Sequence, residues 1–205
     1  MDQRLVAWAR AVKARRRQKL PTLWLFTDPN RPRDALLAAR HLPPGLCGIV
    51  FRPDATPNGL TLARGLARLC RARHLALTIA GDWRLAAAAG TGQHLRLARK
   101  ERARLTARPI TASAHNLREA RASARAGATL IFLSPAFPTH THPGAPALGP
   151  IRFAAIARRC ALPVLALGGI DGHAARRLSG TGCAGAGAIR ALNPGDLAAR
   201  TAAAR

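Results

Sequence analysis

The stretch TLIFLSPAFPTHTHPGAPALGPIRFAAIARRCALPVLALGGID, residues 129–171, decides the fold of this chain. It begins with the apolar run TLIFLSP (129–135) and ends with PVLALGG (163–169), and each run stops at a polar or glycine-rich turn. A short apolar run without polar alternation is typical of a strand that is buried on both faces, as in a parallel sheet. Helical patterns lie between such runs in this chain. The stretch therefore predicts two parallel strands with a helical segment between them.

The same alternation extends over the whole chain. Eight apolar runs are candidate strands: LWLFTD (23–28), GIVFR (48–52), LALTIAG (75–81), TGQHL (91–95), PITASAH (109–115), TLIFLSP (129–135), PVLALGG (163–169) and AGAGAI (184–189). With about eight helices between them they predict an α/β protein, either a closed (β/α)8 barrel or an open doubly wound sheet. The first strand–helix junction, TDPNRPRDAL (27–36), lacks the GxGxxG pattern of dinucleotide-binding sheets. This absence makes a dinucleotide-binding sheet less expected and leaves both architectures open. In the closed barrel, we expect the strand around 93–95 to be the shortest and least regular.

The first twenty residues are set apart from the barrel. Over residues 1–20 the spacing of Leu5, Val6, Trp8, Ala9 and Val12 predicts a basic amphipathic helix or arm. Such a helix either caps a domain, which we favour, or lies on an anionic surface. The length of 205 residues suits one domain, which we place at 21–205.

Charge and composition bear on the partners and on the location. Lys and Arg number 33 against 9 Asp and Glu, a net charge of +24, but the arginines are scattered among alanines along the whole chain. A small phosphorylated ligand accounts for this charge as well as nucleic acid does, and we do not expect nucleic acid as a partner. The four cysteines form no CxxC pair, and no apolar run reaches the ~18 residues of a membrane span. These features favour reduced thiols and a cytoplasmic protein with no membrane partner.

In a barrel, function is found at the carboxyl ends of the strands, and phosphates are often held after strands seven and eight. Gly168 and Gly169 end the seventh candidate strand, and Arg190 follows the eighth. Glycine lets a ligand approach the backbone closely, and arginine binds phosphate with two parallel hydrogen bonds. Asp171 suits the cap of the next helix, which would leave that helix's N-terminus to an anion. An ordinary strand-to-helix turn is the alternative interpretation.

The segment SPAFPTHTHPGAPALG (134–149) is the most unusual in the sequence. On an extended chain, Thr139 and Thr141 face one way, and His140 and His142 the other. Three interpretations stay open: hydroxyls and an imidazole lining an anionic-ligand pocket, a metal bound by the two histidines, and a structural loop.

Other strand ends carry polar side chains. Asp82 is either a magnesium ligand or a helix N-cap. Arg52 is a candidate phosphate ligand, and His94, Ser113 and His115 are either functional or packed polar residues.

The order of these strand ends resembles the thiamine phosphate synthase/TenI superfamily. The resemblance covers about residues 23–192, and its most specific part is 111–171, where SAH, the SPxFPTxTxPG loop, the ALG exit and the ALGGI strand occur in order. It implies a TIM barrel and a transferase that joins hydroxymethylpyrimidine diphosphate to thiazole phosphate. In that reaction pyrophosphate leaves with the help of Mg²⁺.

The resemblance also implies the site residues. The matching positions imply a magnesium ligand, Asp82, and the ligand-contacting residues Arg52, Ser113, Thr139, Thr141, Gly168, Gly169 and Ile189. Of these we predict Ser113 as catalytic, together with His142 from the loop after the sixth strand. We add Ser134 and Arg190, which follow the sixth and eighth candidate strands, to the substrate- and phosphate-binding residues.

The chain departs from the family's pattern mainly around the diphosphate. Val50 and Asp54 stand where the family's motif has Gln and Lys, Gly81 replaces an Asn, and RLARK (96–100) replaces the segment with the second magnesium acid. His142 stands where the synthase has Lys, and Arg190 where it has Ser.

Three functions follow from the sequence. The first is a thiamine phosphate synthase-like transferase that uses pyrimidine and thiazole phosphates. The second is a divergent TenI-like protein, a thiazole tautomerase or a regulator that binds a phosphorylated ligand. The third is a basic binding module for nucleic acid. The sequence leaves a homodimer open.

Overall fold

Eight parallel strands close into one barrel in the order in which they occur along the chain. The structure is a computed structural model, and it describes residues 1–17, 19–31, 34–53, 58–96, 101–104, 108–139, 144 and 146–193. The strands are β1 (Leu23–Phe26), β2 (Cys47–Phe51), β3 (Ala76–Ala80), β4 (Gly92–Leu95), β5 (Ile110–Ala114), β6 (Leu130–Leu133), β7 (Val164–Leu167) and β8 (Ala186–Ala188). The pairing of β1 with β8 closes the barrel, which confirms the predicted TIM barrel over an open sheet.

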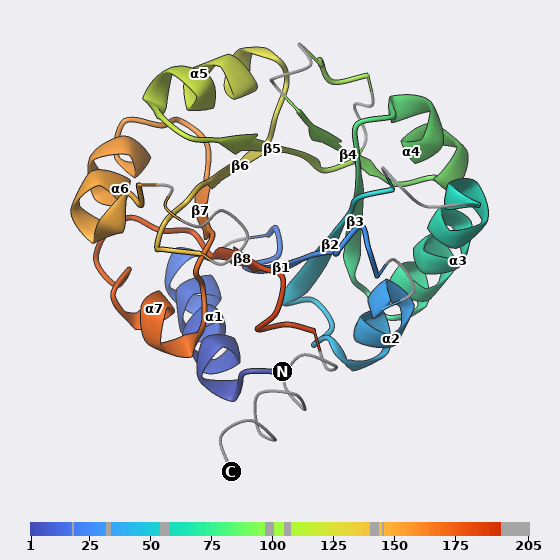
Figure 1. Ribbon diagram of the computed structural model, residues 1–205, viewed down its shortest axis with the longest axis horizontal. Coiled ribbons are helices and arrows are strands. Elements are labelled where there is room, and N and C mark those ends of the chain that lie inside the picture. Colours follow the sequence, from blue (N-terminus) through green and yellow to red (C-terminus); the bar gives the residue numbers. More distant parts are fainter. Residues whose placement is uncertain are drawn as a thin grey trace.

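Helices form a ring around the strands (Figure 1). They are α1 (Gln3–Arg16), α2 (Asp34–His41), α3 (Gly59–Ala72), α4 (Trp83–Ala89), α5 (Leu117–Arg125), α6 (Gly149–Ala157) and α7 (Gly172–Arg176). Except for α1, each follows a strand, as the alternating sequence predicts. Between β4 and β5 the described residues, 96, 101–104 and 108–109, contain no helix.

Burial follows the two faces of each strand. One set of side chains fills the barrel, among them Trp24, Phe26 and Phe132, whose rings meet edge to face. The other set, which includes Leu25, Ile49 and the apolar faces of the helices, forms the layer between strands and helices. Because both faces are covered, the strands have the continuous apolar runs that the sequence displays.

The prediction for the fourth strand is wrong in one respect. β4 has four residues, whereas β8 has only three. β8 is rich in alanine and glycine, AGA, and its short side chains give it little apolar surface to extend the strand.

The N-terminal helix α1 packs on the outside of the barrel beside α7 (Figure 1). Leu5, Val6, Ala9 and Val12 are buried, the face that the spacing predicts. Its basic residues 13, 15 and 16 lie in the last turn, where positive charge interacts favourably with the helix dipole. The packing is that of a helix capping a domain. None of the helices in the described part of the chain has the length and apolar character that a membrane span needs.

Candidate functional site

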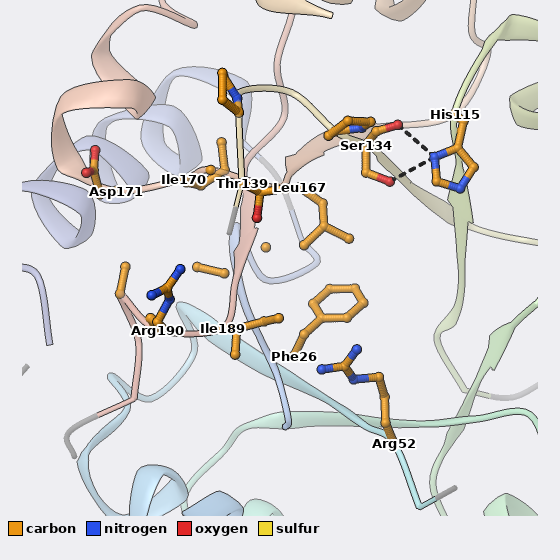
Figure 2. A pocket seen from close by; sticks show the side chains of 17 residues that line it. Phe26, Arg52, His115, Ser134, Thr139, Leu167, Ile170, Asp171, Ile189 and Arg190 are labelled. Carbon is orange, nitrogen blue, oxygen red and sulfur yellow. Dashed lines mark hydrogen bonds between the residues drawn. The ribbon is translucent and has the colours of Figure 1, made fainter. Parts of the chain in front are cut away.

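A cavity of about 490 Å³ opens at the carboxyl ends of the strands. Its walls come from the ends of β1, β2, β5, β6, β7 and β8 and from the residues that follow them (Figure 2). Seven of the predicted site residues line it: Arg52, Ser134, Thr139, Gly168, Gly169, Ile189 and Arg190. This volume is in the range of small-ligand sites.

The side of the cavity formed by β7 and β8 is mostly backbone. Gly168 and Gly169 have φ angles of +90° and +65°, a region that side chains rarely adopt. A Cβ on Gly169 would lie 2.8 Å from Cβ of Phe137 and would collide with the carbonyl oxygen of Pro138. The N–H of Phe137 donates to the carbonyl of Gly168 at 3.1 Å. The two glycines therefore let the loop after β6 close over the end of β7.

The start of α7 differs from the prediction made for it. Asp171 caps the helix, because its Oδ1 accepts hydrogen bonds from the N–H groups of His173 and Ala174. However, Oδ2 of Asp2 accepts a 2.7 Å hydrogen bond from the N–H of Gly172. Two carboxylates of the protein already bind the first N–H groups of α7. The expectation that this N-terminus is left to an anion is therefore wrong.

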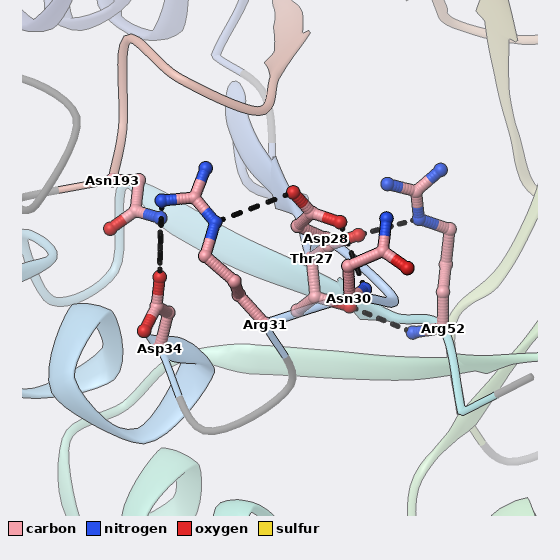
Figure 3. Close-up of polar contacts among 7 residues, drawn as sticks. All are labelled: Thr27, Asp28, Asn30, Arg31, Asp34, Arg52 and Asn193. Atoms are coloured by element: carbon pink, nitrogen blue, oxygen red, sulfur yellow. Dashed lines mark hydrogen bonds and ion pairs between the residues drawn. The ribbon is translucent and has the colours of Figure 1, made fainter. Parts of the chain in front are cut away.

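Arg52 lies across the cavity from Arg190, with Phe26 and Ile189 between them (Figure 2). Its Nε donates to the carbonyl oxygen of Thr27 at 2.6 Å, and its backbone N–H donates to the Thr27 hydroxyl at 2.9 Å (Figure 3). These bonds hold the stem of Arg52 against the end of β1. The cavity thus has an arginine on each of two opposite sides.

A chain of hydrogen bonds runs through the barrel beneath this region. The hydroxyl of Thr78 is 3.3 Å from that of Thr111, and Thr111 is 2.8 Å from Nδ1 of His94. Nε2 of His94 is 3.1 Å from Oγ of Ser113. Burial, together with the positive charges of Arg96 and Arg52, lowers the pKa of His94 to about 3. His94 is therefore a neutral ring, and it links Ser113 to the interior of the barrel.

A family comparison gives this arrangement a context. A model of the family described as thiamine monophosphate synthase, TMP-TENI, matches residues 25–192. The chain belongs to this family.

Similar proteins of known name agree with the family assignment. Thiamine-phosphate synthase of Geobacillus thermodenitrificans is 33% identical over 138 residues, and that of Geobacillus kaustophilus is 34% identical over 142 residues. Each match covers 64% of this chain and 62% of the relative, so the chain matches less than two thirds of the length of these relatives. Thiamine phosphate pyrophosphorylase from Pyrococcus furiosus has the same fold, with a TM-score of 0.72 at 24% identity over 88% of this chain and 91% of its own.

The ends of β5 and β6 meet at one edge of the cavity. Nδ1 of His115 donates to the carbonyl oxygen of Ser134 at 2.9 Å and lies 3.3 Å from its hydroxyl (Figure 2). Ser113 lies below, bonded to His94, and is not among the residues that line the cavity. Thr141 and His142 lie outside the described residues.

Asp82, the family's implied magnesium ligand, has another partner here. Its carboxylate is the N-cap of α4 and accepts a 2.8 Å hydrogen bond from the N–H of Arg84. Asp28, at the end of β1, accepts from the N–H of Asn30 and lies 3.6 Å from Nε of Arg31 (Figure 3). Within the described residues, no three His, Cys, Asp or Glu side chains are grouped so as to hold a metal ion.

Sequence reasoning missed the apolar floor of the cavity. Phe26 and Leu167 line it, and both precede the strand ends that we searched for polar residues. The alternation of faces along a strand is the signal that could have found them. Leu167, for example, lies two positions before Gly169 and points toward the same side of the sheet.

Proposed function

We propose that this chain is a thiamine phosphate synthase-like transferase, which joins hydroxymethylpyrimidine diphosphate to thiazole phosphate. The observation that carries the proposal is one cavity with an arginine on each of two opposite sides and an apolar floor between them. A reaction between two phosphorylated heterocycles needs this arrangement, because each anion requires its own binding group while the rings must meet in the middle. Membership of the family supports the same function.

The thiazole phosphate is placed on the side of β7 and β8. Gly168 and Gly169 allow the phosphate to approach the backbone, and Ile189 gives the ring an apolar contact. Arg190 is exposed and can make a bidentate contact with the phosphate. The hydroxyls of Thr139 and Thr141 are further candidates for contacts to the same group. The pyrimidine then lies over Phe26 and Leu167, with its diphosphate toward Arg52.

The reaction requires little acid–base chemistry from the protein. The bond between the pyrimidine methylene and the diphosphate oxygen breaks, and pyrophosphate leaves with the electron pair. The thiazole nitrogen then gives its lone pair to the methylene carbon, and a C–N bond forms. The positively charged cavity stabilises the leaving group, and positioning supplies much of the rest of the rate. In this proposal Ser113 acts from below the cavity, where its hydroxyl is bonded to His94, and His142, which lies outside the described residues, is the second catalytic residue.

Magnesium is the ion that the family implies for this reaction, and the described residues do not fit it. Mg²⁺ binds through carboxylates and other oxygen ligands with near-octahedral geometry. The carboxylates of Asp28 and Asp82 each accept a hydrogen bond from a neighbouring backbone N–H, and within the described residues neither belongs to a group of three His, Cys, Asp or Glu side chains. No step of the proposed reaction is therefore assigned to a metal.

We also propose a cytoplasmic location, with pyrimidine and thiazole phosphates as the partners. The four cysteines are free. Burial raises the pKa of Cys47 and Cys70 to about 12, so both remain protonated thiols at neutral pH. Protonated thiols persist in a reducing compartment.

The test is direct synthesis. The protein is mixed with hydroxymethylpyrimidine diphosphate and thiazole phosphate, and thiamine phosphate is measured by chromatography alongside released pyrophosphate. We expect one pyrophosphate for each thiamine phosphate, and an Arg190→Ala variant with a KM for thiazole phosphate raised about 10-fold. Exposed Arg68 on α3 is the matched control, because Arg68→Ala removes the same charge away from the cavity.

Failure would take a recognisable form. Thiazole phosphate that binds, in calorimetry, without any thiamine phosphate formed would reject the transferase and favour the divergent TenI-like alternative. Conversion of a thiazole tautomer by the same protein would then identify a tautomerase.

A further inference from the structure

Two guanidinium groups flank the end of β3. The register pairs Phe51 with Ile79 and Ala80 with His94, so Arg52, one residue past β2, lies level with Ala80 and His94. Arg96 comes two residues after His94, and the alternation along a strand turns both toward the barrel. Burial, together with the charges of Arg96 and Arg52, lowers the pKa of His94, which agrees with this placement. The ends of β2 and β4 thus bring two fixed positive charges to one sector of the barrel mouth.

Gly81 gives the second arginine its place. A Cβ at position 81 would lie 3.6 Å from Cζ of Arg96, 3.7 Å from one terminal nitrogen and 3.8 Å from Nε. The guanidinium therefore lies directly over a residue that has no side chain. The φ of Gly81 is +86°, so substitution by a residue with a side chain would also strain the backbone. A longer side chain at this position would exclude Arg96 from the end of β3.

A metal ion has no comparable place in this sector. A divalent cation beside two guanidiniums is repelled by both. Of the carboxylates nearby, Asp82 is exposed and caps α4, and Glu101 accepts a 2.7 Å hydrogen bond from the backbone N–H of Arg96. Each guanidinium, by contrast, has a planar fork of N–H donors that matches phosphate oxygens, and in Arg52 the Nε that donates to Thr27 fixes the direction of this fork. The sector is therefore suited to binding an anion directly, without a bridging ion.

The position also separates this sector from the one around Arg190. Arg52 and Arg190 lie on opposite sides of the cavity, with Phe26 and Ile189 between them (Figure 2). One arginine and two glycines suit a monophosphate on the side of β7 and β8. Two arginines from alternate strands suit an anion with more charge and a larger span.

We infer that the guanidinium groups of Arg52 and Arg96 bind the diphosphate of one substrate directly, in the role that a metal ion would otherwise fill. The inference rests on the proposed transferase function for the identity of the substrate. Its consequence is that diphosphate binding needs no divalent cation in this protein. On release of the product, the same two arginines hold the pyrophosphate.

Binding of inorganic pyrophosphate to the full chain tests this inference without any turnover. Calorimetry is performed in EDTA and again in excess Mg²⁺. We expect pyrophosphate to bind in EDTA with an affinity that Mg²⁺ does not increase. Arg96→Ala and Arg52→Ala should each lower this affinity about 10- to 100-fold. Arg96→Lys, which keeps the charge but not the fork, should bind with intermediate affinity. Far-UV circular dichroism of each variant checks that the barrel is folded.

Two controls separate this sector from general positive charge and from the monophosphate side. Arg68→Ala on α3 removes one exposed charge elsewhere and should leave pyrophosphate affinity unchanged. Arg190→Ala should weaken the binding of inorganic phosphate and of thiazole phosphate, and it should change the affinity for pyrophosphate by no more than about twofold. Loss of pyrophosphate affinity in Arg190→Ala but not in Arg96→Ala would overturn the assignment of the sector.

The two proposals fail in different ways. If thiamine phosphate forms only with Mg²⁺ and pyrophosphate binds only with Mg²⁺, the transferase stands and the arginine pair is rejected. If pyrophosphate binds in EDTA through Arg52 and Arg96 but no thiamine phosphate forms under any condition, the transferase is rejected and the anion site stands.

Discussion

Nε2 of His94 lies 3.1 Å from the hydroxyl oxygen of Ser113, while its Nδ1 lies 2.8 Å from that of Thr111. A hydroxyl can donate or accept, so the neutral ring keeps both nitrogens hydrogen-bonded in either tautomer. A protonated ring would place a third positive charge near the guanidiniums of Arg52 and Arg96. The interior of the barrel is therefore built around a neutral histidine, and Ser113 is its contact at the barrel mouth.

The pH dependence of stability follows from this neutral ring. Burial and the two arginines lower the pKa of His94 to about 3 from an ordinary 6.5, so between these values the unfolded chain binds the extra proton. The contribution of His94 to stability is fully present above pH 6.5 and is lost as pH falls toward 3. Between pH 7 and pH 5 the loss is about 2 kcal/mol. Urea unfolding at the two pH values measures it.

A substitution isolates this contribution. His94→Gln should remove most of the difference between pH 7 and pH 5, whereas His173→Gln, at an exposed position on α7, should retain it. If the unfolding free energy falls equally between pH 7 and pH 5 in the wild-type protein and in His94→Gln, other groups cause the fall.

Ser113 is expected to act on turnover more than on stability. Ser113→Ala removes one of the two hydrogen bonds of His94, at a cost of about 1 kcal/mol in unfolding free energy. If Ser113 is also near the reacting groups, kcat for thiamine phosphate should fall about 100-fold or more with little change in KM. Steady-state kinetics of thiamine phosphate formation measures both constants.

Thr111 supplies the matched control. Thr111→Val removes the other hydrogen bond of His94, deeper in the barrel, at a comparable cost in stability. Its kcat should stay within a few-fold of the wild-type value. Equal losses of kcat in Ser113→Ala and Thr111→Val would reduce Ser113 to a packing role.

The barrel was predictable from sequence because both faces of every strand are covered. Apolar runs such as LIFL in β6 and VLAL in β7 indicate this burial by themselves, whichever strands pair with them. The cavity was predictable in part, since Gly168, Gly169 and Arg190 follow from the rule that ligands bind at strand ends. These local signals depend only on the strand to which each residue belongs.

Contacts between distant segments could not be predicted in this way. Nothing in the sequence around Asp2 indicates that its carboxylate reaches Gly172, 170 residues later. Similarly, the place of Arg96 over Gly81 depends on the register between β3 and β4, and a strand's own sequence does not specify that register. The prediction of an open N-terminus at α7 failed for this reason.

The carboxylate of Asp2 should therefore contribute to stability twice. Its Oδ1 accepts from the N–H groups of Arg4 and Leu5 at the start of α1, and its Oδ2 accepts from Gly172. Asp2→Ala should lower the unfolding free energy by about 2 kcal/mol, near the top of the range for a helix cap. Asp2→Asn keeps one carbonyl oxygen for α1 and should lose about half as much. Urea titrations measure both, and equal losses in the two variants would contradict the double role.

Gly169 gives the sharpest test of the monophosphate side. Gly169→Ala would place a Cβ 2.8 Å from Cβ of Phe137 and against the carbonyl of Pro138, so the loop after β6 must move away from the end of β7. Thr139 lies in that loop, and we expect thiazole phosphate affinity to fall at least about 10-fold in calorimetry.

Gly180 has a similar φ of +79°, but a Cβ there meets no atom within 4 Å. Gly180→Ala therefore carries the same backbone strain, about 1–2 kcal/mol, without the collision, and it should bind thiazole phosphate normally. If Gly169→Ala folds and binds thiazole phosphate normally, the closure of this loop over β7 is not needed for binding.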